Sequence, residues 1–103
     1  MLQWLDTLSE RVMPSHTAVL VVDIQNDFCH PDGYVGKKFG VDAVTNEALA
    51  ARNQSLTSKA RALGATIIWV KAIYDPKYLS APMLLKGGSI SDEPRCYDDS
   101  WGA

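Results

Sequence analysis

Residues 17–24 read TAVLVVDI, and residues 65–74 read ATIIWVKAIY. Both runs are apolar without alternation and rich in β-branched side chains, which is typical of strands covered on both faces, as in a parallel sheet between helix layers. Between them, residues 43–63 favour one long helix, with Asp42 or Thr45 suited to cap its start and Gly64 suited to end it. Strand, helix and strand at this spacing predict a βαβ unit.

The flanking segments carry weaker patterns. Apolar residues three to four apart predict a short leading helix, which Pro14 ends: Leu2, Leu5, Leu8 and Val12. Three glycines make residues 31–42 look like turns. Prolines and glycines interrupt residues 74–103, which predicts a lid or surface excursion with at most a short helix near Leu84. We therefore divide the chain into a leading helix and linker (1–16), a βαβ unit (17–73) and a lid or loop excursion (74–103).

Composition excludes several classes of protein. The chain has 103 residues, of which 47% are hydrophobic and 21% charged, as expected for one globular domain or part of one. A formal net charge of −2 and the lack of a basic stretch argue against a nucleic-acid partner. The sequence contains neither an apolar run that could cross a membrane nor a basic signal-peptide start. Two cysteines form no disulfide framework, so we expect a reducing, cytoplasmic setting.

The first apolar run ends on an acid, Asp23. In open α/β sheets, ligands bind just beyond the carboxyl ends of the strands, where Asp23 is expected. A partly desolvated carboxylate there would have a raised pKa, which suits proton transfer. The alternative is that Asp23 only caps the turn that follows, and position alone does not separate the two interpretations.

Four stretches together resemble the isochorismatase-like cysteine hydrolases. They are VVDIQNDFCHPDG (21–33), NQSLTSKARALGATIIWV (53–70), IYDPKYLS (73–80) and RCYDDSWGA (95–103). The similarity is greatest to the amidohydrolase branch, which cleaves N-carbamoyl, ureido or biuret-type linear amides. It implies an α/β fold, a three-layer sandwich with a parallel sheet (the Rossmann-like isochorismatase fold), and a small amide as substrate. It also implies a homo-oligomer for the full-length protein, and neither a cofactor nor a nucleic-acid or membrane partner.

The resemblance also implies a catalytic triad of Asp, Lys and Cys that works through a thioester. Asp23 matches the acid of this triad. The family's lysine and cysteine lie in K-x-x-Y/F-S/D-x-F and G-x-x-T-x-x-C settings, which these 103 residues do not contain. We therefore expect residues 1–103 to be the N-terminal portion of a single hydrolase domain, incomplete in fold and inactive alone. The alternative is a non-catalytic, truncated module that binds a partner chain or a small ligand.

Three aromatic residues match positions that line the family's substrate pocket: Phe28, Tyr74 and Trp101. Phe28 could equally be a core residue, and the other two could simply anchor their loops. Cys29 and Cys96 are expected to be small buried side chains without a catalytic role.

Several polar residues have plainer interpretations. Asp27 is expected in a turn or cap, and Gln25 is expected to hydrogen-bond backbone near the site. Lys71 is expected to be solvated at the end of its strand. His16 and His30 have no metal-ligand spacing, so we predict no metal site.

Overall fold

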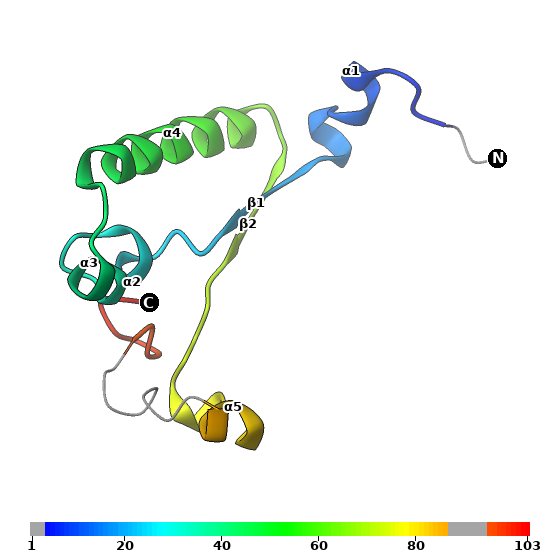
Figure 1. Cartoon of the computed structure of the whole chain (residues 1–103). Coiled ribbons are helices and arrows are strands. Elements are labelled where there is room, and N and C mark those ends of the chain that lie inside the picture. The colour runs from blue at the N-terminus through cyan, green and yellow to red at the C-terminus, as the bar shows by residue number, and fades with distance from the viewer. Residues whose placement is uncertain (1–3, 87–94) are drawn as a thin grey trace.

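The protein is a mixed α/β structure built on a two-stranded parallel sheet (Figure 1). The computed structural model describes residues 4–86 and 95–103. Strand β1 (Ala18–Val22) pairs with β2 (Thr66–Val70), with Ala18 opposite Thr66 and Val22 opposite Val70. Helix α4 (Ala43–Ala62) joins the two strands. The predicted βαβ unit is confirmed, and each strand is shorter than its apolar run.

The ends of α4 follow the local signals in the sequence. The Asp42 carboxylate accepts a hydrogen bond from the Thr45 amide at 3.1 Å, so Asp42 is the N-cap. Gly64 follows the helix with φ +94°, a left-handed conformation that glycine adopts without steric cost. Both predicted helix boundaries are confirmed.

The segment after β1 is helical where turns were predicted. Helix α2 (Asn26–Cys29) and helix α3 (Tyr34–Phe39) pack against each other. Gly33 permits this approach, because a Cβ there would lie 2.0 Å from the Asn26 carbonyl oxygen. Gly36 lies inside α3, where a Cβ would come within 2.2 Å of the Pro31 carbonyl oxygen. These glycines therefore serve close packing between short helices, and the prediction of turns throughout residues 31–42 was wrong.

The remaining helices are short. Helix α1 (Leu8–Arg11) begins at a capping box formed by Thr7 and Glu10, later than the apolar spacing predicted; Leu2 lies outside the described residues. Two 3-10 turns follow at Pro14–His16 and Pro76–Tyr78. Helix α5 (Ala81–Lys86) confirms the short helix near Leu84, and the rest of the predicted excursion, 87–94, lies outside the described residues. Within residues 4–86 and 95–103, no helix has the length and apolarity needed to span a bilayer.

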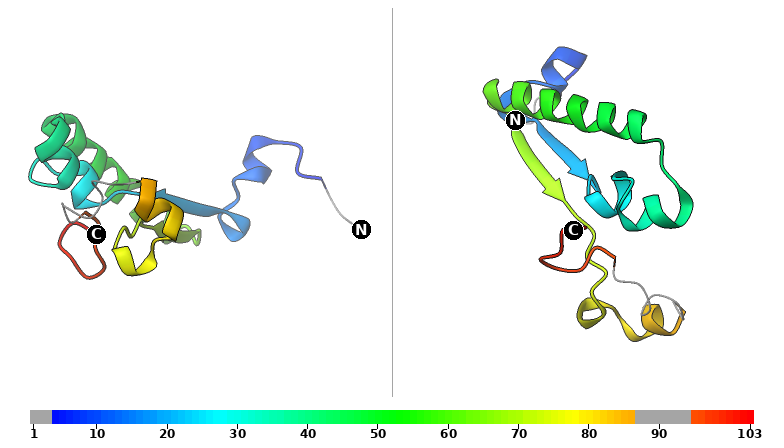
Figure 2. Two further views of the ribbon diagram at one scale, coloured as in Figure 1. Left: turned by 60° about the horizontal axis from the view of Figure 1, so that its bottom comes forward. Right: turned by 90° about the vertical axis from the view of Figure 1, so that its left-hand side faces the viewer.

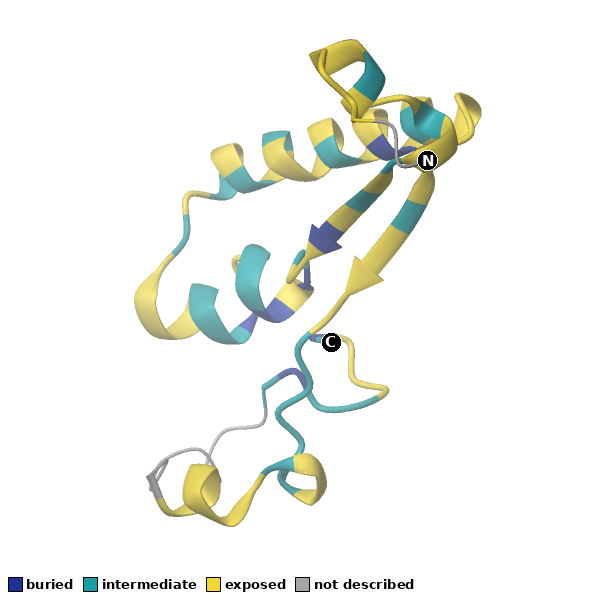
Figure 3. Ribbon diagram, turned by 90° about the vertical axis from the view of Figure 1, so that its right-hand side faces the viewer, coloured by how far each residue is buried: buried dark blue, intermediate teal, exposed yellow. Residues whose placement is uncertain are grey.

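One face of the sheet is partly covered and the other is open: Val21 is buried, whereas its register partner Trp69 on the same face is 57% exposed. Figure 2 shows α4 lying along the sheet on one side. Val21 is buried to 4% exposure on the face that α4 contacts. The alternate side chains of both strands are exposed by 42–58%: Leu20, Val22, Ile68 and Val70 (Figure 3). The expectation that both faces are buried was wrong for the described residues, because they provide a helix layer on one side of the sheet.

The shape of the chain is correspondingly open. The radius of gyration is 18.0 Å, and the principal extents are 53 × 36 × 22 Å. A compact domain of this length has a radius of gyration of about 13 Å. Among the hydrophobic residues that the structure describes, Val21 and Cys96 are the buried ones. The isolated chain therefore presents much apolar surface to water.

We predict that the isolated chain self-associates through the open sheet face. An exposed parallel sheet with unpaired edges and an apolar surface recruits other chains. Sedimentation velocity should show species larger than monomer whose fraction rises with concentration. Ile68→Lys should shift the distribution toward monomer, while Ser55→Lys on the exposed surface of α4 should not. A monodisperse monomer that melts in one sharp transition would contradict this prediction.

Candidate functional site

Asp23 lies directly after β1, at the carboxyl end of the sheet. Its amide donates to the Val70 carbonyl at 3.0 Å, which continues the pairing of β1 with β2. Its side chain is exposed, and its backbone is left-handed, with φ +58°. Such a conformation costs a non-glycine residue about 1–3 kcal/mol, although Asp and Asn tolerate it best. No hydrogen bond from a backbone amide reaches the Asp23 carboxylate within the described chain, so the carboxylate does not act as a cap there.

Gln25 extends the sheet with its side chain. Its amide nitrogen donates to the Ala72 carbonyl at 3.0 Å, and its amide oxygen accepts from the Ala72 amide at 2.7 Å. This paired contact imitates one more step of the strand ladder beyond Val70. The predicted hydrogen bonding of Gln25 to backbone near the site is confirmed. The contact fixes the Asp23–Gln25 turn against the continuation of β2.

Asp27 connects the start of α3 with the C-terminal segment 95–103. Its carboxylate is buried, and Oδ1 accepts from the Tyr34 amide at 3.0 Å while Oδ2 accepts from the Cys96 amide in a short hydrogen bond. The Asp27 amide donates to the Gly102 carbonyl at 3.0 Å. Asp27 therefore does hold the first amide of α3, as a cap would. Its contacts with residues 95–103 are the larger feature, and sequence reasoning missed them.

Further contacts seat the C-terminal segment on the α2 region. The Asn26 side chain donates to the Trp101 carbonyl at 2.7 Å, and the His30 and Trp101 rings meet edge to face with centroids 5.1 Å apart. A Cβ on Gly102 would lie 2.0 Å from an Asp27 carboxylate oxygen, so any larger residue there would force the Asp27 side chain to move. The Trp101 side chain remains 57% exposed.

Cys96 is fully buried within the same cluster. Its carbonyl accepts from the Tyr74 amide at 3.1 Å, and its backbone is left-handed, with φ +45°. Burial and then the charge of Asp27 raise the pKa of the Cys96 thiol to about 11, with a smaller contribution from Asp23. The thiol is therefore protonated near neutral pH, which makes it a poor nucleophile.

The other predicted pocket residues are distributed around this cluster. The Tyr74 ring is partly buried and packs against the Arg95 guanidinium, with 4.9 Å from Cζ to the ring centroid. Phe28 is partly buried on α2, between Asp27 and Cys29. Tyr74 and Trp101 thus contact the cluster around Asp27, Phe28 lies on α2, and Asp23 lies directly after β1. Arg95 was not singled out from the sequence.

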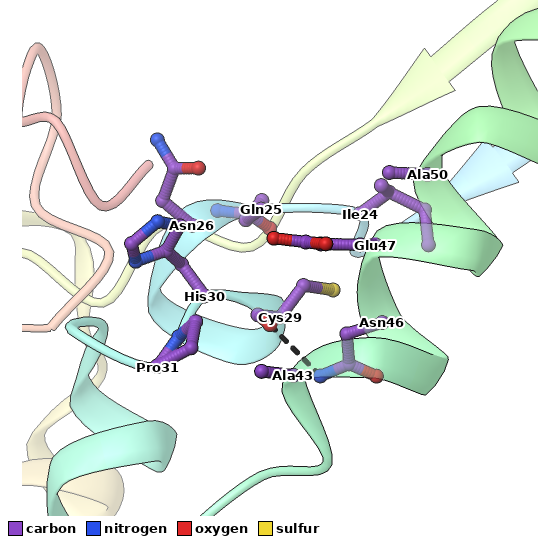
Figure 4. A pocket seen from close by; sticks show the side chains of 10 residues that line it. All are labelled: Ile24, Gln25, Asn26, Cys29, His30, Pro31, Ala43, Asn46, Glu47 and Ala50. Carbon is purple, nitrogen blue, oxygen red and sulfur yellow. Dashed lines mark hydrogen bonds between the residues drawn. The ribbon is translucent and has the colours of Figure 1, made fainter.

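Two cavities flank the site. Figure 4 shows the first, about 150 Å³, where Cys29 and Asn46 approach each other between α2 and α4 and the Asn46 side chain donates to the Cys29 carbonyl at 2.8 Å. The second, about 340 Å³, lies at the carboxyl end of the strands, where ligands bind in open α/β sheets. Lys71, which is exposed as expected, helps to line it. The other residues that line the second cavity are Val21, Ile24, Gln25, Trp69, Val70 and Ala103.

Comparison with known proteins adds no assignment: no family model matches the chain, and no solved structure matches it significantly. Within the described ranges, no three His, Cys, Asp or Glu side chains are grouped so that they could hold a metal ion. The chemistry of the site must therefore be inferred from its own residues.

Proposed function

We propose that this chain supplies the catalytic acid and part of the substrate pocket of an isochorismatase-like cysteine amidohydrolase. The observation that carries the proposal is Asp23. Its carboxylate is exposed at the carboxyl end of β1, and it is held on a left-handed backbone. Strained backbone of this kind gathers at functional sites. The sequence motifs shared with the family supply the chemical identity.

The finer fold belongs to the same proposal. We infer a three-layer sandwich with a longer parallel sheet, the Rossmann-like isochorismatase fold, of which residues 1–103 form the N-terminal portion. Support comes from the open sheet face, where Leu20, Val22, Ile68 and Val70 need an apolar cover. Further polypeptide would provide that helix layer and would pair with the unpaired strand edges.

The proposed reaction is hydrolysis of a C–N bond in a small linear amide. Asp23 accepts the proton of a cysteine thiol, and the thiolate attacks the amide carbonyl. The C–N bond breaks, the amine leaves with a proton, and a thioester remains on the cysteine. Water then cleaves the thioester, which releases the acid and restores the thiol. The cysteine and the lysine that steadies it would come from further polypeptide, because these 103 residues lack the two motifs in which the family carries them.

A second function, that of a non-catalytic binding module, is favoured by a different observation. The open sheet face is a large apolar surface in a chain with few buried hydrophobic residues. A partner chain could cover it without any reaction at Asp23. The two functions separate on whether the native protein turns over an amide.

We predict that the 103-residue chain does not hydrolyse N-carbamoyl amino acids, ureidoacrylate or biuret above background, whereas the native protein that carries this sequence does. These 103 residues lack the settings in which the family's lysine and nucleophilic cysteine lie, so we expect the covalent route to be closed. Release of ammonia, together with the intact mass of the native protein, measures both halves of the prediction. Turnover by the isolated chain that is lost in Cys29→Ala or Cys96→Ala would contradict the assignment of the nucleophile. A native protein without turnover would favour the binding module.

A further inference from the structure

The Arg95 guanidinium is held between two tyrosine rings. Its Cζ lies 5.2 Å from the centroid of Tyr34 and 4.9 Å from that of Tyr74. Arginine stacks on aromatic faces in this way, and the contact stabilises the flat group in one orientation. The two rings come from distant parts of the chain, the start of α3 and the segment after β2.

The backbone around Arg95 is fixed on both sides. The Cys96 amide donates to the Asp27 carboxylate, and the Cys96 carbonyl accepts from the Tyr74 amide. The same carboxylate accepts from the Tyr34 amide, so one hydrogen-bonded network positions Arg95 and both rings. Both oxygens of Asp27 already accept backbone amides. Asp27 therefore orients the cluster without serving as the partner of the guanidinium.

The hydrogen-bond donors of Arg95 are poorly used. Its Nε is buried and has no hydrogen-bond partner, and its Nη1 reaches the Tyr34 hydroxyl at 3.5 Å, the outer limit of a hydrogen bond. Within residues 4–86 and 95–103, no carboxylate forms an ion pair with it. A guanidinium has five N–H donors, and leaving a buried donor without an acceptor is costly. The Arg95 guanidinium is therefore held in one orientation with N–H donors that can still bind an acceptor.

We propose that Arg95, framed by Tyr34 and Tyr74, binds a carboxylate on the ligand. The planar guanidinium matches a carboxylate through two parallel N–H···O bonds, which a single neutral donor cannot reproduce. The Tyr34 hydroxyl accepts from Lys38 at 3.0 Å and from Arg95, so its own hydrogen points elsewhere and can reach the same ligand. The identity of the ligand rests on the proposed function: for an amidohydrolase, the substrates would be N-carbamoyl or ureido acids whose carboxylate lies away from the scissile bond.

The test is binding, and it does not require turnover. The full chain, labelled with ¹⁵N, is titrated with N-carbamoylglycine and separately with its neutral amide, N-carbamoylglycinamide. We expect the Arg95 Nε–H resonance to shift with the acid, and the acid to bind about tenfold or more tightly than the amide. Arg95→Lys keeps a cation but loses the fork, so the preference for the acid should disappear. Arg52→Lys on the exposed surface of α4 should leave it unchanged.

Three results would overturn the proposal: equal binding of the two probes, no binding of either, or an undiminished preference in folded Arg95→Lys. The proposed function fails separately. Preference for the acid without hydrolysis by the native protein would retain Arg95 as a carboxylate-binding residue and reject the amidohydrolase. If the native protein hydrolysed the acid and its neutral amide at equal rates, the amidohydrolase would be retained and Arg95 would be rejected as the carboxylate-binding residue.

Discussion

Asp27→Ala should destabilise the folded chain by about 3–5 kcal/mol and release residues 95–103 from the α2 region. The buried carboxylate accepts the Tyr34 and Cys96 amides, and its removal leaves two buried donors without acceptors. Each loss of this kind costs about 1–3 kcal/mol, and charged acceptors lie at the upper end. Urea denaturation gives the change in free energy of unfolding. Amide hydrogen exchange at Tyr34 and Cys96 shows whether the segment has been released.

Two variants make the Asp27 result specific. Asp27→Asn keeps the shape and one carbonyl oxygen but turns an NH₂ group toward a donor, so we expect roughly half the loss. Asp32→Ala changes an aspartate in the same loop whose side chain is 79% exposed and lies 3.8 Å from His30, a contact worth about 0–1 kcal/mol. A loss in Asp27→Ala no greater than that in Asp32→Ala would show that Asp27 does not hold the C-terminal segment.

The elements of the fold that could be predicted are those specified by near neighbours in the sequence. Asp42 reaches an amide three residues away, and Gly64 takes its left-handed conformation at the end of its own helix. The two β-branched runs also specify their strands locally. Helix α3 escaped prediction because Gly33 and Gly36 are typical of turns. Their role here is to let backbones approach, which depends on neighbours that the local pattern does not reveal.

The burial of the strands shows a different limit. Continuous apolar runs predict that both faces are covered, and the described residues partly cover the face that contains Val21. The apolar pattern thus predicts a cover over Leu20 and Ile68 that the described residues do not provide. A hydrophobic pattern specifies how much cover a strand needs, whereas the source of that cover is a tertiary property.

Some residues of the candidate site could likewise be predicted from local sequence signals, and others depend on long-range contacts. Asp23 could be found because an acid at the end of an apolar run is a local signal, and Gln25 lies two residues further on. The link between Asp27 and Cys96 spans 69 positions and could not be inferred from spacing. Arg95 lies in a stretch that looked like a loop. Its proposed role in binding a ligand carboxylate depends on its contacts with Tyr34 and Tyr74, which are distant from it in the sequence. Long-range polar contacts of this kind require the fold to be known.

Asp23→Asn should leave folding intact and lower the amidase activity that we propose for the native protein about a hundredfold or more, because it removes the proposed proton acceptor for the thiol. Asparagine adopts the left-handed conformation as readily as aspartate, so the backbone at φ +58° should not change. The measurement is kcat/KM for an N-carbamoyl amino acid, with a thermal melt of each variant as the check on folding.

Asp23→Gly separates the catalytic role of the residue from a structural one. Glycine relieves the left-handed strain, so the variant should be as stable as the parent or more stable by up to about 1 kcal/mol, since the gain in unfolded-state entropy offsets part of the relief. Its activity should nevertheless fall as far as that of Asp23→Asn, because both lack the carboxylate. Stability and activity would then change independently, as expected where strain is retained for function. If Asp23→Asn instead unfolds the protein while its remaining folded fraction keeps full activity, the carboxylate is structural and the proton acceptor must be sought elsewhere.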